Sequence, residues 1–172
     1  MSLSRKECAY HEAGHAVVAR ALGFRLLSVD IIERDDTGGR CGWESTGTPL
    51  YKEVSKDKFA PMTEEDRAAY TDPKSAVVSI AGPLAQAMYN RESESYLSGE
   101  DLQHIDKAEA VVSPRRRKTF LATTRARAWR ILMNPKNAAA LDTLAHALLE
   151  KESIDGPTAE KIIRTARSKV DL

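Results

Sequence analysis

The sequence predicts a mostly helical protein with one small β-sheet, an α+β fold. Apolar residues recur every three or four positions through most of the chain, which is typical of amphipathic helices. One run, residues 24–33, is instead rich in Leu, Val and Ile, and a second short run at 40–45 follows two glycines. The 172 residues are 42% hydrophobic and 30% charged, enough to build a single domain with its own core.

The N-terminal part is expected to be helix, strand and then a long irregular segment. Residues 4–22 carry one stripe of side chains at helical spacing, and Gly23 ends the helix. The stripe consists of Cys8, His11, His15, Val18 and Leu22. Residues 24–33 form a strand, and 34–73, with four glycines and three prolines, are irregular apart from the short strand at 40–45.

The remaining elements are expected to be helices. Residues 74–90 are helical, but Gly82-Pro83 predicts a kink or two short helices, because proline lacks a backbone donor. A helix follows at 101–112. A basic helix then runs from Pro114 to about Met133, and two more helices, separated by a break at 155–157, complete a C-terminal helical bundle. We divide the chain into a metal-site region, 1–112, and C-terminal helices, 113–172.

Composition excludes several classes of protein. No apolar run reaches the roughly 20 residues that a membrane span requires, and the N-terminus lacks a secretory core. Cys8 and Cys41 are isolated, so a disulfide framework is not expected. We predict a cytoplasmic protein without a membrane span.

Charge is unevenly distributed despite a net charge of only +1. The stretch from Ala110 to Leu141 contains no acidic residue but eight basic ones. We favour a solvated helix face that pairs with the protein's own acids. The alternative is a binder of polyanions or acidic partners through residues 115–130. Nucleic acid is not the expected partner, because no aromatic residues suited to base stacking are interleaved with the charges.

The motif H-E-x-x-H at residues 11–15 is the strongest functional signal. Four residues are about one helical turn, so His11 and His15 project side by side and can share one cation. Imidazole nitrogens suit Zn²⁺. Glu12 is angled away from the pair, where it can act as general base on a water molecule. A chance match is the alternative, but unpartnered histidines on a buried stripe would be costly.

A catalytic zinc site needs a third protein ligand. The extended form of the motif is absent, because Val18 and Ala21 occupy its glycine and third-histidine positions. Glu33 lies downstream at a usable distance. The better source is the acidic helix start at 98–108, which offers Glu100, Asp101 and His104.

The chain resembles the peptidase domain of the FtsH-type ATP-dependent zinc proteases. The family's H-E-A-G-H-A-V-V-A helix matches residues 11–19, and its E-E-D-R-x-x-Y-T stretch matches 64–71. Its G-G-R-A-A-E-E helix is echoed at 81–87, its S-G-A-x-x-D-[LI] segment at 98–105, and its closing helices at 140–152. The resemblance therefore covers nearly the whole chain in order.

The resemblance implies a single zinc-peptidase domain over residues 1–172, with one Zn²⁺ per chain. Asp101 is the third ligand it favours, with His104 as the alternative. It also implies a substrate-binding edge formed by Gly38, Gly39, Gly42 and Trp43, where an extended chain adds as a strand.

Two departures from the family pattern are visible. Gln86 stands where the family has a carboxylate, and the sequence contains no phosphate-binding G-x-x-x-x-G-K-[ST] motif. We therefore expect an endopeptidase for unfolded or flexible polypeptides, served by a separate ATPase or by a homo-oligomer. The alternative is a non-catalytic regulatory or binding module with a structural zinc.

Overall fold

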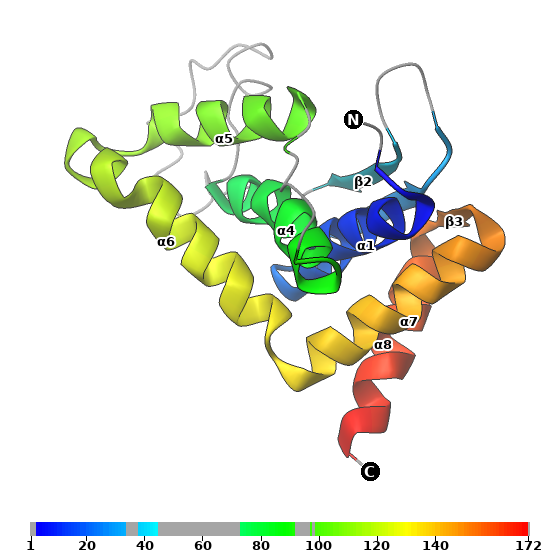
Figure 1. The fold of residues 1–172 in the computed structure, drawn as a ribbon. Coiled ribbons are helices and arrows are strands. Elements are labelled where there is room, and N and C mark those ends of the chain that lie inside the picture. Colours follow the sequence, from blue (N-terminus) through cyan, green and yellow to red (C-terminus); the bar gives the residue numbers. More distant parts are fainter. Residues whose placement is uncertain (1–2, 34–37, 45–72, 92–96, 98, 172) are drawn as a thin grey trace, which may run out of the picture.

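The computed structural model describes residues 3–33, 38–44, 73–91, 97 and 99–171. Helices dominate it, and the predicted fold class, mostly α with a small sheet, is confirmed (Figure 1). The helices are α1 (Arg5–Ala21), α4 (Pro73–Tyr89), α5 (Gly99–Val111), α6 (Pro114–Leu132), α7 (Pro135–Lys151) and α8 (Gly156–Ser168). The strands are β1 (Arg25–Asp30), β2 (Arg40–Glu44) and β3 (Ser153–Asp155), and a 3-10 turn, Lys169–Asp171, follows α8.

The sheet is antiparallel and has the order β2-β1-β3. In the register, Val29 of β1 lies between Cys41 of β2 and Ile154 of β3. The sequence analysis missed β3, because three residues are too few for an alternating pattern and their partner is far away in the chain. A Cβ atom on Gly156 would lie 1.9 Å from the carbonyl oxygen of Leu26, so the turn into α8 requires glycine.

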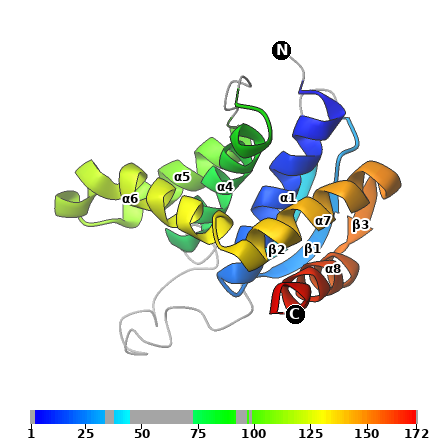
Figure 2. The ribbon, with the colours of Figure 1, turned by 60° about the horizontal axis from the view of Figure 1, so that its bottom comes forward.

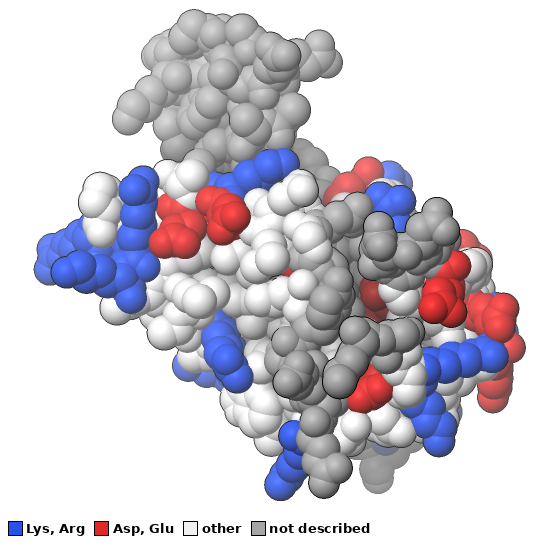
Figure 3. All heavy atoms as spheres, turned by 45° about the horizontal axis from the view of Figure 1, so that its top comes forward, with Lys and Arg blue, Asp and Glu red and all other residues white. Residues whose placement is uncertain are grey.

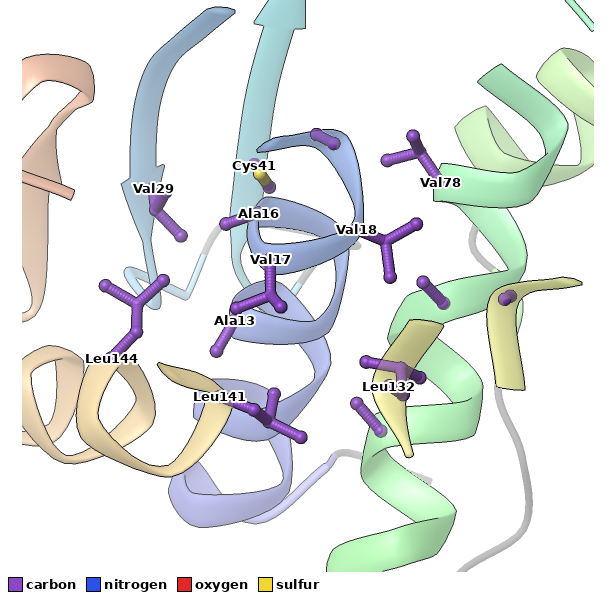
Figure 4. Close-up of a cluster of buried hydrophobic side chains, with 14 of the residues drawn as sticks. Ala13, Ala16, Val17, Val18, Val29, Cys41, Val78, Leu132, Leu141 and Leu144 are labelled. Carbon is purple, nitrogen blue, oxygen red and sulfur yellow. The ribbon is translucent and has the colours of Figure 1, made fainter. Parts of the chain in front are cut away.

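Helix α1 lies at the centre of the fold, between the sheet and α4 (Figure 2). Its apolar side chains meet Val29 of the sheet on one side, Val78 of α4 on another and Leu141 of α7 on a third (Figure 4). The approach to α4 is close at Gly14, where a Cβ atom would lie 2.5 Å from Cβ of Ala85. Small residues thus bring α4 against the H-E-x-x-H face of α1.

Helix α4 is one helix and not the two short ones that Gly82-Pro83 allowed. Pro83 lies inside it and removes one backbone hydrogen bond. Residues 75–86 are nonetheless all buried, so apolar packing on both sides of the proline holds the helix together. Tertiary contacts override the local signal here.

The C-terminal helices brace the first half of the chain. Tyr10 donates a hydrogen bond to Oδ1 of Asp142 in α7 at 2.5 Å, and Arg5 donates to the carbonyl of Leu149. The backbone N–H of Leu26 in β1 donates to Oε1 of Glu160 in α8. Among the described residues, no helix has the length and apolar character that crossing a membrane requires.

Candidate metal centre

Three buried side chains from two helices converge beside α4. His11 and His15 come from the middle of α1, and Asp101 comes from the start of α5. Nε2 of His11 lies 3.8 Å from Oδ2 of Asp101, and Nε2 of His15 lies 3.7 Å from Oδ1. Each residue is 4% exposed. Within the described residues, these three form the cluster that can hold a metal ion, their ligand atoms lying within 4.8 Å of one another.

The donor set and its spacing fit zinc. Zinc takes imidazole nitrogen and carboxylate oxygen at about 2.0–2.2 Å, which places neighbouring tetrahedral ligands about 3.4 Å apart. The distances of 3.7 and 3.8 Å are therefore a few tenths of an ångström wider than a closed site. Three protein ligands leave a fourth position open, as in catalytic zinc sites.

Helix α4 fixes the orientation of both histidines. Nδ1 of His15 lies 2.8 Å from the carbonyl oxygen of Val78, and Nδ1 of His11 lies 3.1 Å from Oε1 of Gln86. A carbonyl oxygen can only accept a hydrogen bond, so Nδ1 of His15 is the donor to Val78. The side-chain oxygen of Gln86 is likewise an acceptor, so Nδ1 of His11 is also a donor. Each Nε2 then keeps its lone pair for a metal, the arrangement that outer partners of metal-binding histidines produce.

Gly82 makes room for the two rings. It lies between Val78 and Gln86, one helical turn from each, on the face of α4 that meets α1. A Cβ atom at this position would lie 2.3 Å from Nε2 of His15 and 2.8 Å from Cδ2 of His11. Any larger residue would occupy the space that the histidines need.

The two histidines differ in their affinity for a proton. Burial lowers the pKa of His15 to about 4, and the neighbouring His11 adds to this effect against the attraction of Asp101. Burial also acts to lower the pKa of His11, but the interaction with the nearby Asp101 and the charge of Glu12 outweigh burial, so its pKa is raised. The carboxylate thus favours positive charge at this site, whether from a proton or a metal.

Glu12 is buried beside the cluster without being one of its members. It is 6% exposed, and a Cβ atom on Gly39 would lie 2.9 Å from its Cγ.

The two cysteines near the cluster are protonated. Burial, together with Glu12 and other carboxylates, raises the pKa of Cys8 to about 12 and that of Cys41 well above its ordinary value. Both thiols are therefore neutral near pH 7.

The predicted substrate edge reaches the metal cluster through Trp43. Its ring stacks on His15, with centroids 5.8 Å apart and an interplanar angle of 27°. Gly42 pairs with Ser28 in the edge strand β2. Gly38 is exposed and its carbonyl accepts the thiol hydrogen of Cys8, whereas Gly39 packs against α1. Their role in substrate binding stays a prediction.

None of the other candidates for the third ligand belongs to the cluster among the described residues. His104 is half-buried, with its ring against the edge of Trp43 at 5.4 Å and its Nδ1 3.3 Å from Oγ of Ser79. Glu33 is exposed. The side chain of Glu100 and the stretch 64–71 lie outside the described residues.

Sequence reasoning missed the contribution of α4. It treated Gln86 only as a lost carboxylate and Gly82 only as a helix breaker. The spacing of residues 78, 82 and 86, at intervals of one turn, is the signal that places all three on one helix face.

These features define a protein whose H-E-x-x-H helix, together with an aspartate from a second helix, forms a candidate metal centre. No protein-family model matches the chain. The chain is a distant homologue of ATP-dependent zinc metalloprotease FtsH 1 of Symbiobacterium thermophilum, at 28% identity over 92% of its own length. This confirms the resemblance that the motifs predict. The chain spans only 29% of the relative's length.

Proposed function

We propose that this protein is a zinc-dependent metalloendopeptidase that cleaves unfolded or flexible polypeptides. The observation that carries the proposal is the convergence of His11, His15 and Asp101 in a buried cluster beside the carboxylate of Glu12. A site that held metal only for structure would not need this second carboxylate beside its three ligands. The name of the distant relative, a zinc metalloprotease, agrees with this reading.

In this proposal His11, His15 and Asp101 hold the metal, and Glu12 moves the proton. When bound, zinc supplies Lewis acidity toward a peptide carbonyl and a water molecule. The carboxylate of Glu12 accepts the proton of the attacking water and then gives it to the leaving amine. Glu12 suits this role because it follows His11 on the same buried helix without being part of the ligand cluster.

The edge strand β2 is the proposed position for the substrate. A polypeptide that adds to it in extended form runs past Trp43, whose ring lies on His15. Pairing of this kind needs a substrate segment free of its own secondary structure, so we propose unfolded or flexible chains as the substrate class. Delivery of such chains by a separate ATPase or by a homo-oligomer, in the cytoplasm, is part of the same proposal.

The substitution Glu12→Gln tests the proposal. We expect the purified wild-type protein to hold one zinc per chain by elemental analysis and to cleave fluorescein-labelled casein. Glu12→Gln should retain zinc and lose hydrolysis by about 10²–10⁴-fold, because only the proton acceptor is removed. The matched control is Glu33→Gln, an exposed glutamate outside the cluster, which should behave like wild type.

Two outcomes would overturn the proposal. A Glu12→Gln protein as active as wild type would remove Glu12 from the mechanism. Stoichiometric zinc without hydrolysis of casein or of unstructured peptides by the wild type would instead support the non-catalytic zinc module.

A further inference from the structure

Helix α6 carries two apolar stripes, and only one of them is buried. Phe120, Thr124, Ala128 and Leu132 face the core at intervals of four residues. A second stripe, at positions 122, 126, 129 and 133, faces outward, with Trp129 45% and Met133 52% exposed. Large apolar side chains that gather on one exposed face mark sites of interaction.

The second stripe forms one wall of a groove. The lining includes Leu84 and Met88 of α4, Trp129 of α6, and Met133, which directly follows α6, and the groove measures about 1260 Å³. Helices α4 and α6 run beside each other in Figure 1. An apolar groove between two helices is the kind of surface that receives the apolar face of a third helix.

The charged residues that line the groove have one sign. They are Arg91, Arg125 and Arg130, and no acidic residue is among the described residues of the lining. In the part of the chain that the structure describes, none of these arginines forms an ion pair, and neither does any other basic residue of α6. Its basic residues are exposed, which agrees with the solvated face that we favoured, while their pairing with the protein's own acids is not seen among the described residues. Blue side chains also gather where α6 begins (Figure 3).

We propose that the groove between α4 and α6 binds an acidic amphipathic helix of a partner protein. Apolar residues of that helix would cover Trp129 and Met133, and its glutamates or aspartates would meet Arg91, Arg125 and Arg130. A symmetric pair of copies would bring the arginines of both grooves together, which disfavours self-association through this face. The phosphate backbone of a nucleic acid would leave the apolar side chains of the groove uncovered. This surface is separate from the metal centre, so the inference does not depend on the proposed function.

The test uses a synthetic peptide of about five helical turns, with leucines at i, i+3, i+4 and i+7 and glutamates beside them. Fluorescence anisotropy of the labelled peptide measures binding to the full chain. The same peptide with lysine in place of glutamate, and one with permuted residue order, serve as ligand controls. We expect only the acidic amphipathic peptide to bind, and binding to weaken as salt rises.

Matched variants locate the binding site. Met133→Ser and Arg125→Glu should each weaken binding about tenfold or more, the size typical of a central interface residue. Leu121→Ser and Arg127→Glu, which change exposed residues of the same helix outside the groove, should change it less than about twofold. If the two control variants lost as much peptide affinity as the two groove variants, the groove would not be the binding site. Preference for the lysine peptide, tighter binding of a DNA duplex, or a dimer in sedimentation that Met133→Ser dissolves would overturn the proposed partner.

Discussion

Helices α1 and α6 are nearly equal in length but handle charge in opposite ways. Eleven of the 17 residues of α1 are buried, and they include His11, Glu12 and His15. Only four of the 19 residues of α6 are buried, and none of those is ionisable. All seven basic residues of α6 remain at the surface.

The two helices differ in how they meet the free-energy cost of burying ionisable side chains. Burying ionisable groups is costly unless they are partnered, and α1 meets that condition through Asp101, Val78 and Gln86. Helix α6 avoids the cost by keeping its arginines exposed to water, where they can contact another molecule. Changes on α1 and its partners should therefore act on the metal, and changes on α6 should act on partner binding.

The largest expected effect is at the third ligand. Asp101→Ala removes a direct ligand. It should therefore weaken zinc binding by more than about 10–100-fold, the loss typical when only an outer hydrogen-bond partner of a ligand is removed. His104→Ala should bind zinc nearly as tightly as wild type, since its ring contacts Trp43 and Ser79. Competition with a chromophoric chelator measures both. Loss of zinc from His104→Ala, with retention in Asp101→Ala, would point to a three-histidine site instead.

The next effect is at Gln86, which supports His11 from α4. Gln86→Ala leaves the buried Nδ1–H of His11 without this acceptor and should lower zinc affinity about 10–100-fold. Gln86→Glu should raise it, because a carboxylate acceptor makes the imidazole a more basic ligand. Ser79→Ala on the same helix is the control, since it removes only the contact to His104. Equal zinc affinity in Gln86→Ala and wild type would deny Gln86 this positioning role.

The sequence predicted the ligand helix better than its surroundings. The H-E-x-x-H spacing fixed the relation of His11 to His15 because one helical turn determines it locally. The resemblance favoured Asp101, which the structure brings to the same cluster. The register of α4 against α1 depends on contacts between residues some 70 positions apart, which no local pattern encodes. The roles of Val78, Gly82 and Gln86, and the strand β3, were missed for that reason.

A smaller effect is expected at Gly82. Gly82→Ala places a methyl group 2.3 Å from Nε2 of His15, and overpacking of this kind costs about 1–3 kcal/mol. Alanine gains up to about 1 kcal/mol in helix propensity, so the clash should win. The rings cannot easily yield, because Val78 and Gln86 hold their Nδ1 atoms. Urea denaturation measures the loss, and Gly99→Ala, with open space around it, is the control. A Gly82→Ala protein of unchanged stability would mean that the histidine pair moves freely.

The smallest effect is expected at the serines that directly precede the two helices. Ser4 caps α1, its Oγ accepting from the N–H of Glu7 and its own N–H donating to Oε2 of Glu7 at 2.9 Å. Ser113 precedes α6 without any such side-chain hydrogen bond. Ser4→Ala should therefore cost about 1 kcal/mol of unfolding free energy, whereas Ser113→Ala should cost only about 0.5 kcal/mol or less.

The cap on α1 also reaches α4. Oε1 of Glu7 accepts from the side-chain amide of Asn90, just beyond the end of α4, at 3.0 Å. Loss of the Ser4 cap frees Glu7 to move, so it should loosen the helix pair that holds the metal ligands. Hydrogen exchange of the amides at the start of α1 and the end of α4 would rise together in Ser4→Ala and not in Ser113→Ala. If the two variants lost equal stability, or if exchange rose only at the substituted helix, the start of α1 would be no more closely tied to its neighbour than that of α6.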